Sequence, residues 1–182
     1  MTRVIDVQAH LLPSIAIASI VFGGVFDRLP GLRLGFAHGG GYGVFGSGRF
    51  DHGTRIRPEL DVVDLPSVYM RRMWFDCLAH DELALKFLVE RVGSDRIVLG
   101  TDDPADMGLD QPVAWLEACP SLSPEQRTSM LATNPAEWLD LGPDGSWARR
   151  SDEGSACGRH SSRPHDPDQS DSGRSIGEGF ER

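Results

Sequence analysis

Short, nearly uninterrupted apolar runs separated by helical patterns are the feature that most restricts the fold of this sequence. The clearest run covers residues 96–100 (Arg-Ile-Val-Leu-Gly), and residues 4–7, 32–37 and 73–78 are further strand candidates. Strands without polar alternation are typical of a parallel sheet covered on both faces. The runs therefore predict an α/β fold with parallel strands.

Three segments between or after these runs show the apolar spacing of helices. Residues 15–29 carry apolar side chains at helical intervals. Residues 81–92 are amphipathic and are followed by Gly93, which suits a helix C-cap. Residues 123–139 begin at Ser123, a suitable N-cap with glutamate and glutamine in the first turn. Helices thus alternate with strands along the chain.

The composition changes near residue 142. Of the 40 residues from 143 to 182, 17 are Gly, Ser or Pro and 14 are charged. Such a segment buries too little apolar surface to offset the entropy lost on ordering. We therefore expect one folded domain over residues 1–142 and a disordered C-terminal tail over residues 143–182.

Charge and hydropathy exclude two classes of partner. The chain has 27 acidic and 18 basic residues and a formal net charge of −9, so it lacks the basic surface that binds nucleic acid. The longest apolar stretch, residues 11–26, is interrupted by Pro13 and Gly23 and falls short of the ~20 residues of a membrane-spanning helix. We expect neither nucleic acid nor a membrane as a partner.

The cysteines indicate the redox environment. Cys77, Cys119 and Cys157 are far apart and form no Cys-x-x-Cys pair, which argues against a structural zinc cluster or a thioredoxin-like motif. An odd number of widely spaced cysteines favours a reducing compartment. We therefore expect a cytoplasmic protein.

Three apolar runs are each followed by a residue that can bind a metal or move a proton. His10 follows the first run, His38 the second and Asp102 the last. The carboxyl ends of parallel strands share one face, where binding sites form. Imidazole and carboxylate groups are ligands for zinc and related divalent ions. The spacing alone is equally compatible with hydrogen-bonded surface histidines and a helix-capping aspartate.

Residues beside His38 add to the candidate site. Glycines at 39–41 would let a ligand approach the backbone closely. Arg49 could bind a substrate carboxylate through two parallel hydrogen bonds. A surface ion pair of Arg49 with Asp51 or Asp61 is the alternative interpretation.

Five short motifs occur in a characteristic order within residues 1–142. They are Gly-Gly-Val-Phe-Asp-Arg-Leu-Pro at 23–30, Phe-Ala-His-Gly-Gly-Gly at 36–41, Gly-Arg-Phe-Asp-His-Gly at 48–53, Arg-Ile-Val-Leu-Gly-Thr-Asp at 96–102 and Asn-Pro-Ala-Glu-Trp-Leu-Asp-Leu at 134–141. Their order and spacing resemble the amidohydrolase-related (amidohydrolase 2) family. The resemblance covers most of the expected domain and none of the expected tail.

The resemblance implies a (β/α)₈ barrel of the TIM type that uses a divalent metal, usually zinc and sometimes manganese. It implies an enzyme that acts on a carboxylated small molecule by decarboxylation or hydrolysis. His38 matches the catalytic histidine that activates metal-bound water or moves a proton, and Asp102 matches a catalytic, metal-binding aspartate. Arg49 matches an arginine that binds the substrate carboxylate, and His10 matches a second metal ligand. A bound metal would lower the pKa of water to ~7.

The chain departs from this pattern in two places. Gln8 stands where the family's His-x-His motif has its first histidine. Only 27 residues separate His10 from His38, whereas a family member would place most of the barrel there. The chain thus lacks the equivalents of barrel strands two to five and keeps strands one, six, seven and eight. We therefore expect a partial barrel, whose unpaired edges are compatible with a homo-oligomer.

Three other interpretations remain open. The chain could be a non-catalytic remnant or partner-binding fragment, its activity lost with the missing strands. His-Gly-Gly-Gly also occurs in esterases, but no serine here lies in the required Gly-x-Ser-x-Gly frame. A phosphate-binding loop at residues 39–41 would lack the P-loop lysine. We interpret His52 and His80 as structural hydrogen-bonding residues.

Overall fold

The structure of this chain is a computed structural model that describes residues 13–57, 59–60, 62–142 and 145–146. The expected strand at 4–7 and the expected metal ligand His10 lie outside the described residues. The expected tail also lies outside them, apart from residues 145–146.

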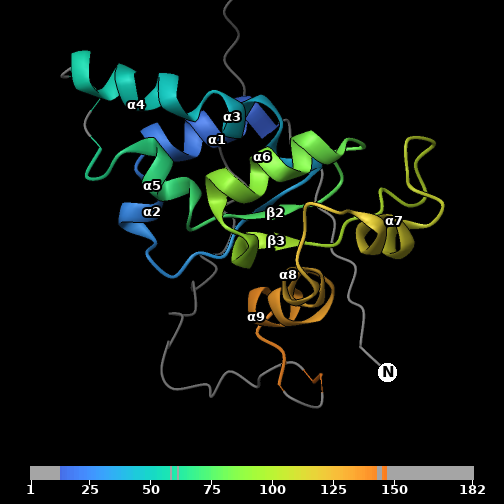
Figure 1. Cartoon of the computed structure of the whole chain (residues 1–182). Helices are drawn as coiled ribbons and strands as arrows, with labels where there is room; N and C mark the ends of the chain where they lie inside the picture. Colours follow the sequence, from blue (N-terminus) through green and yellow to red (C-terminus); the bar gives the residue numbers. More distant parts are fainter. Residues whose placement is uncertain (1–12, 58, 61, 143–144, 147–182) are drawn as a thin grey trace, which may run out of the picture. The chain divides into compact units, whose positions relative to one another are not determined.

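Among the described residues, three short parallel strands form a sheet (Figure 1). They are β1 (Gly35–Phe36), β2 (Trp74–Asp76) and β3 (Ile97–Val98), in the spatial order β1-β2-β3. Each lies within a run that the sequence predicts as a strand. The prediction of parallel strands joined by helices is confirmed.

The first helical segment differs from its prediction. The sequence predicts one helix over residues 15–29, but the structure has α1 (Pro13–Phe22) and α2 (Val25–Arg28). The break falls at Gly24, whose φ of 61° places it in the left-handed region that glycine adopts without steric cost. The prediction of a single helix is therefore wrong. It followed an apolar spacing that continues across Gly23 and Gly24, although the helix breaks there.

Helices fill the connections between the strands. Between β1 and β2 lie η1 (His38–Gly40), α3 (Tyr42–Phe45), α4 (Ser47–Ile56) and α5 (Pro66–Met70). Between β2 and β3 lie α6 (Glu82–Val92) and η2 (Ser94–Arg96). After β3 follow α7 (Pro112–Ala118), α8 (Pro124–Thr128), η3 (Ser129–Thr133) and α9 (Asn134–Trp138).

Helix α6 begins as its sequence predicts. The Asp81 side chain accepts a hydrogen bond from Ala84 N at 2.8 Å and so caps the first turn. Gly93 follows the helix with a φ of 93°, a left-handed value that ends the helix. The predicted helix and its C-terminal glycine are confirmed.

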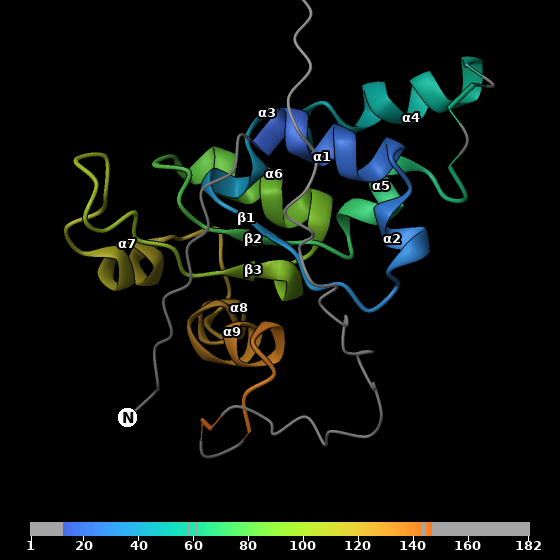
Figure 2. The ribbon, with the colours of Figure 1, turned by 180° about the vertical axis from the view of Figure 1, so that it is seen from behind.

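Helices cover the sheet from two sides. Figures 1 and 2 show α1 and α6 on one side of the strands and α8 and α9 on the other. Phe36 and Phe75 pair across β1 and β2, and their rings stack at 6.1 Å. On the opposite face Trp138 of α9 stacks on Trp74 at 6.2 Å. A Cβ at Gly35 would lie 2.2 Å from Trp138, so only glycine lets this indole pack against β1.

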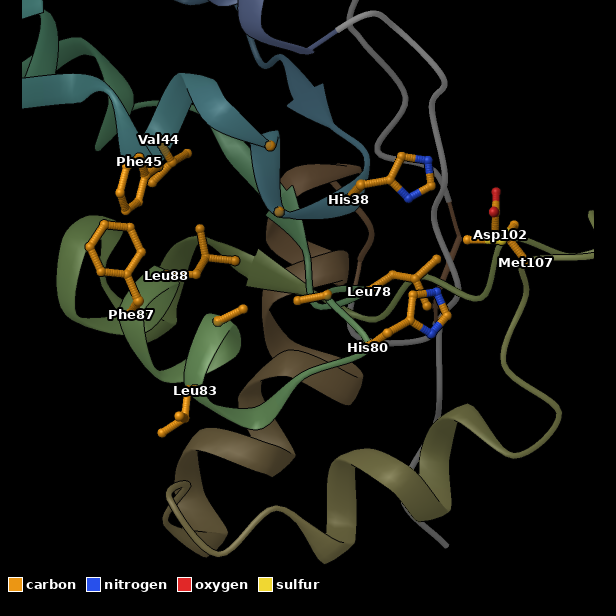
Figure 3. A pocket seen from close by; sticks show the side chains of 14 residues that line it. His38, Val44, Phe45, Leu78, His80, Leu83, Phe87, Leu88, Asp102 and Met107 are labelled. Atoms are coloured by element: carbon orange, nitrogen blue, oxygen red, sulfur yellow. The ribbon is translucent and has the colours of Figure 1, made fainter. Parts of the chain in front are cut away.

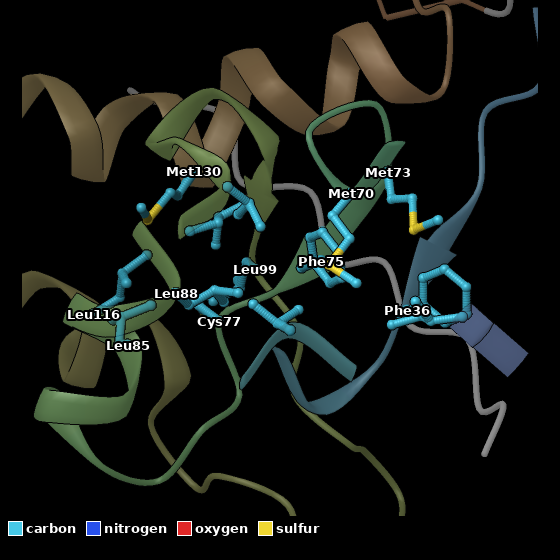
Figure 4. Close-up of a cluster of buried hydrophobic side chains, with 14 of the residues drawn as sticks. Phe36, Met70, Met73, Phe75, Cys77, Leu85, Leu88, Leu99, Leu116 and Met130 are labelled. Atoms are coloured by element: carbon cyan, nitrogen blue, oxygen red, sulfur yellow. The ribbon is translucent and has the colours of Figure 1, made fainter. Parts of the chain in front are cut away.

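The hydrophobic core joins these layers (Figure 4). It includes Phe75 of β2, Leu85 and Leu88 of α6, Leu116 of α7 and Met130 of η3, all nearly or fully buried. Near-continuous apolar strands are buried on both faces, as the sequence predicts for this class of sheet.

The helix after β3 contains a π-helical turn. Residues 124–138 run as α8, η3 and α9, and η3 has the wider π geometry. In that geometry the Met130 carbonyl would pair with the nitrogen of Pro135, which has no hydrogen to donate. The carbonyl instead accepts a hydrogen bond from Leu99 N at 3.1 Å. Because Pro135 cannot donate, the Met130 carbonyl oxygen is available to bond with the backbone at the end of β3.

A second link holds the same helix to the sheet. The Asn134 side-chain amide donates to the carbonyl oxygens of Ser94, at 2.8 Å, and Ile97, at 2.6 Å. Asn134 is buried. The helix start is fixed by the predicted N-cap Ser123, which forms a capping box with Gln126. These contacts position β3 and the loop that follows it.

Candidate functional site

A cavity of about 800 Å³ opens at the carboxyl ends of the strands, between α3, α6 and the loop after β3 (Figure 3). Its two ends differ in character. Three polar side chains gather at one end: His38, His80 and Asp102. The other end is apolar and is lined by Val44, Phe45, Leu83, Phe87 and Leu88.

Each polar residue comes from the end of a different strand. His38 follows β1, His80 follows β2 and Asp102 follows β3. Since the strands are parallel, their carboxyl ends lie at one edge of the sheet, where α/β proteins place their sites. The structure therefore brings His38 and Asp102 to one cavity, as their positions after apolar runs suggest.

The backbone at these three residues is unusual. His38, His80 and Asp102 have φ values of 54°, 52° and 62°. The left-handed region is uncommon for residues other than glycine and costs of order 1 kcal/mol or more. Among the described residues only one other non-glycine residue, Asp140, has a positive φ. Such conformations concentrate at functional sites, which supports this end of the cavity as the site.

The polar groups differ in their access to solvent. Asp102 is buried, whereas His38 and His80 are exposed. The Asp102 carbonyl accepts a hydrogen bond from Ala105 N at 2.6 Å, and Thr101 O accepts one from Leu109 N at 3.0 Å. The loop after β3 is thus folded back on itself, with the carboxylate in the cavity wall and two imidazoles accessible to a ligand.

The turn at His38 is supported from below by Asp76, the last residue of β2. Its Oδ1 accepts hydrogen bonds from Gly39 N at 3.0 Å and Leu78 N at 3.1 Å. Burial raises the pKa of this carboxyl group, while the backbone N–H groups and the nearby His38 act in the lowering direction. The apolar pattern of residues 73–78 predicts a strand but gives no role to Asp76.

Arg49, the predicted carboxylate-binding residue, lies elsewhere. It is on α4, is exposed, and is not part of the cavity lining. Asp51, one of the two ion-pair partners considered for it, accepts a hydrogen bond from Ser67 N at 2.9 Å. Asp61, the other, lies outside the described residues.

The metal-ligand set is incomplete within the described part of the chain. No three His, Cys, Asp or Glu side chains there are grouped closely enough to hold an ion. Asp102 is in place, but the other expected ligand, His10, lies outside the described residues. The described residues alone therefore do not make a metal centre.

His80 is the site residue that sequence reasoning missed. Its position four residues after β2 matches the position of Asp102, four residues after β3. That equivalence could have pointed to His80. It was not used, because His80 was interpreted as a structural hydrogen-bonding residue.

A covered parallel sheet with polar residues beyond its carboxyl edge is typical of α/β proteins, which place their binding sites there. Within that class, the chain belongs to the amidohydrolase family, because the family model described as Amidohydrolase matches residues 4–141. The resemblance seen in the motifs is thereby confirmed.

Two curated relatives carry the same name. A 2-amino-3-carboxymuconate-6-semialdehyde decarboxylase of Dictyostelium discoideum is 43% identical over 133 residues, covering 71% of this chain and 37% of the relative. One from Caenorhabditis elegans is 36% identical over 129 residues, covering 69% of this chain and 32% of the relative. The chain thus spans about a third of the length of these relatives.

Solved structures show the same fold at lower identity. A 5-carboxyvanillate decarboxylase of Sphingomonas paucimobilis has a TM-score of 0.60 and 21% identity, covering 70% of this chain and 39% of that one. A dihydroxybenzoic acid decarboxylase of Polaromonas, solved with bound manganese, has a TM-score of 0.61 and 20% identity, covering 71% and 40%. The expected fold, part of an amidohydrolase-type α/β barrel, is confirmed.

The helices give one further result. Within the described ranges, none has both the length and the apolar character needed to cross a bilayer.

Proposed function

We propose that this chain carries part of the active site of a metal-dependent enzyme that decarboxylates a carboxylated small molecule. The observation that carries the proposal is the meeting of His38, His80 and Asp102 in one cavity. Decarboxylation is favoured over hydrolysis because the relatives and neighbours named above are decarboxylases.

His38 is the proposed proton-transfer residue. Decarboxylation breaks a carbon–carboxylate bond, leaves the electron pair on carbon and releases CO₂, so a proton must then reach that carbon. Imidazole is the side chain whose ordinary pKa lies nearest neutrality, which suits it to this transfer. His38 is exposed in the cavity and can reach a bound ligand.

The proposed metal ligands are His10 and Asp102. The metal is zinc in this proposal, with manganese as the alternative because a neighbouring structure contains it. A divalent metal would polarise the substrate and stabilise negative charge. The described residues do not form a complete ligand set, so metal binding depends on a group outside them.

Two residues are candidates for binding the substrate carboxylate. The family resemblance assigns this role to Arg49, whereas the cavity lining favours His80. Comparing Arg49→Ala with His80→Gln separates the two assignments. The variant with the larger increase in KM identifies the carboxylate-binding residue.

Metal content and turnover test the proposal together. We would measure zinc and manganese in the purified chain by elemental analysis, with Asp102→Ala as the variant expected to lose the metal. CO₂ release would be measured with 2-amino-3-carboxymuconate-6-semialdehyde. His38→Ala should reduce turnover by roughly 10²–10⁴-fold. His52→Ala is the matched control, because His52 is also exposed but lies on α4 outside the cavity lining.

The outcomes are distinct. About one metal per chain with turnover lost in His38→Ala would support the enzyme. No metal and no turnover in the unmodified chain would overturn the proposal and favour the non-catalytic remnant.

We also propose a location for the protein. Two buried free thiols, Cys77 and Cys119, favour a reducing, cytoplasmic location, which cell fractionation would test.

Two further proposals concern assembly and domain limits. We propose that the chain forms a homo-oligomer, which sedimentation would test. We also propose a folded domain over residues 1–142 followed by a tail over residues 143–182, which limited proteolysis would test.

A further inference from the structure

Asp76 is a buried carboxylate with an unsatisfied oxygen. The residue is 2% exposed. Its Oδ1 accepts both of the hydrogen bonds described above, whereas Oδ2 is buried without a hydrogen-bond partner among the described residues. An unpaired buried polar atom costs folding free energy. Aspartate at this position is therefore not explained by stability.

The contacts of Asp76 reach the backbone behind all three polar residues of the cavity. Gly39 directly follows His38, and Leu78 lies on the segment that leads to His80. Gly100 lies on the segment that leads to Asp102, and a Cβ there would be 2.8 Å from Asp76 Oδ2 and 2.6 Å from Asp76 Cβ. Glycine at position 100 thus makes room for this carboxyl group.

The turn above Asp76 needs external support. Gly39 and His38 both have left-handed φ values, 58° and 54°. A histidine keeps a positive φ only when the surrounding contacts hold its backbone in that conformation. The hydrogen bond from Gly39 N to Asp76 Oδ1 is a contact of that kind, and it is charge-assisted when the carboxyl group is ionised.

We propose that Asp76 is a positioning residue for His38. By holding the Gly39 N–H it fixes the backbone of the His38 turn and keeps the imidazole at the polar end of the cavity. Its effect on catalysis rests on the proposed function, but its effect on the turn does not.

The direct test is amide hydrogen exchange of Gly39, measured by NMR on the full chain. In Asp76→Ala the Gly39 amide should exchange about tenfold faster, the loss expected for one hydrogen bond. Asp76→Asn retains a side-chain oxygen and should keep most of the protection. The Leu88 amide in α6 reports opening of the core and provides the reference rate.

Gly100→Ala tests the same contact without changing Asp76. The added Cβ would displace the carboxyl group, so the Gly39 amide should again exchange faster. Gly48→Ala is the matched control, because nothing lies within 4 Å of a Cβ at that position. Gly100→Ala also decides the question if Asp76→Ala fails to fold.

Turnover provides a second readout. Asp76→Ala should lower kcat by about tenfold and leave KM unchanged, with partial recovery in Asp76→Asn. Unchanged Gly39 exchange in Asp76→Ala and Gly100→Ala would overturn the positioning role. Inactivity of the unmodified chain would instead overturn the proposed function, and the exchange result would still stand.

Discussion

At the scale of single residues, backbone conformation marks the site more clearly than side-chain type. The described residues include histidines and many aspartates, but left-handed backbone distinguishes His38, His80 and Asp102 at the cavity. Strain of this kind is retained where function requires a particular side-chain direction. Replacing such a residue with glycine should therefore relieve the backbone strain and raise the free energy of unfolding, while the side chain at the cavity is lost.

His80 allows this to be measured. His80→Gly relieves the left-handed strain, whereas His80→Ala retains it and removes the same imidazole. We expect the glycine variant to be more stable than the alanine variant by about 1 kcal/mol. Urea unfolding of the two variants gives the difference, and equal stabilities would contradict a strained residue 80.

Asp76 predicts a pH dependence. Burial raises its pKa above the ordinary value. As pH rises through the ordinary range, the unfolded chain releases this proton first while the folded chain retains it. The contribution of Asp76 to stability is therefore present at low pH and is lost as pH rises through the raised pKa. Asp76→Asn lacks this titration.

We therefore expect the stability of wild type relative to Asp76→Asn to fall as pH rises from about 3 upward and to level off above the raised pKa. Urea unfolding of both proteins across this range measures the change. A difference that stays constant with pH would argue against a raised pKa.

At the scale of elements, the helix spanning residues 124–138 is the main support of β3. Its carbonyl at Met130 and its side chain at Asn134 both bond to the β3 segment. Trp138 stacks on Trp74, and the Arg96 guanidinium carbon lies 4.7 Å from the centroid of the Trp74 ring. Loosening this helix should therefore affect β3 before the other strands.

Asn134→Ala tests that support. Removing the amide leaves two carbonyl oxygens, at Ser94 and Ile97, without this donor. We expect a loss of about 2 kcal/mol in the free energy of unfolding, measured with urea. Glu137→Ala, which removes an exposed ion pair with Arg96, should cost under about 1 kcal/mol. Equal losses in the two variants would contradict the assignment.

Local signals account for what could be predicted. The strands at 74–76 and 97–98, helix α6 and the start of α8 follow from apolar runs and capping residues that act within a few residues. Helix α7 was not predicted. The break at Gly24 did not follow, because the apolar spacing continues past it. Among the residues that line the cavity, His38 and Asp102 could be singled out because each directly follows an apolar run. His80 and Asp76 were missed because their roles depend on strands and loops that meet only in three dimensions.

At the scale of the whole molecule, the buried thiols report on the integrity of the core. Cys77 belongs to the hydrophobic core and is fully buried. Desolvation raises the pKa of its thiol to about 12. The reactive thiolate is therefore nearly absent in the folded chain at neutral pH.

We expect Cys77 to be alkylated by iodoacetamide only when the core opens. Its modification, followed by mass spectrometry of the peptide, should rise along the same urea curve as unfolding measured by circular dichroism. Rapid modification in buffer without urea would mean that this part of the core is not closed in solution.

The π-helical turn also bears on which changes of length the chain tolerates. A π turn closes its hydrogen-bonded ring with one residue more than an α turn, so η3 accommodates one extra residue without turning α9 away from the strands. Deleting one residue within η3 would therefore leave Asn134 and Trp138 on nearly the same face of the helix. Pro135 would then stand inside a regular helix, where its ring clashes with the carbonyl oxygen four residues earlier. The wider turn thus makes room for Pro135, and we expect a one-residue deletion in η3 to destabilise the chain through this clash rather than through a rotation of α9.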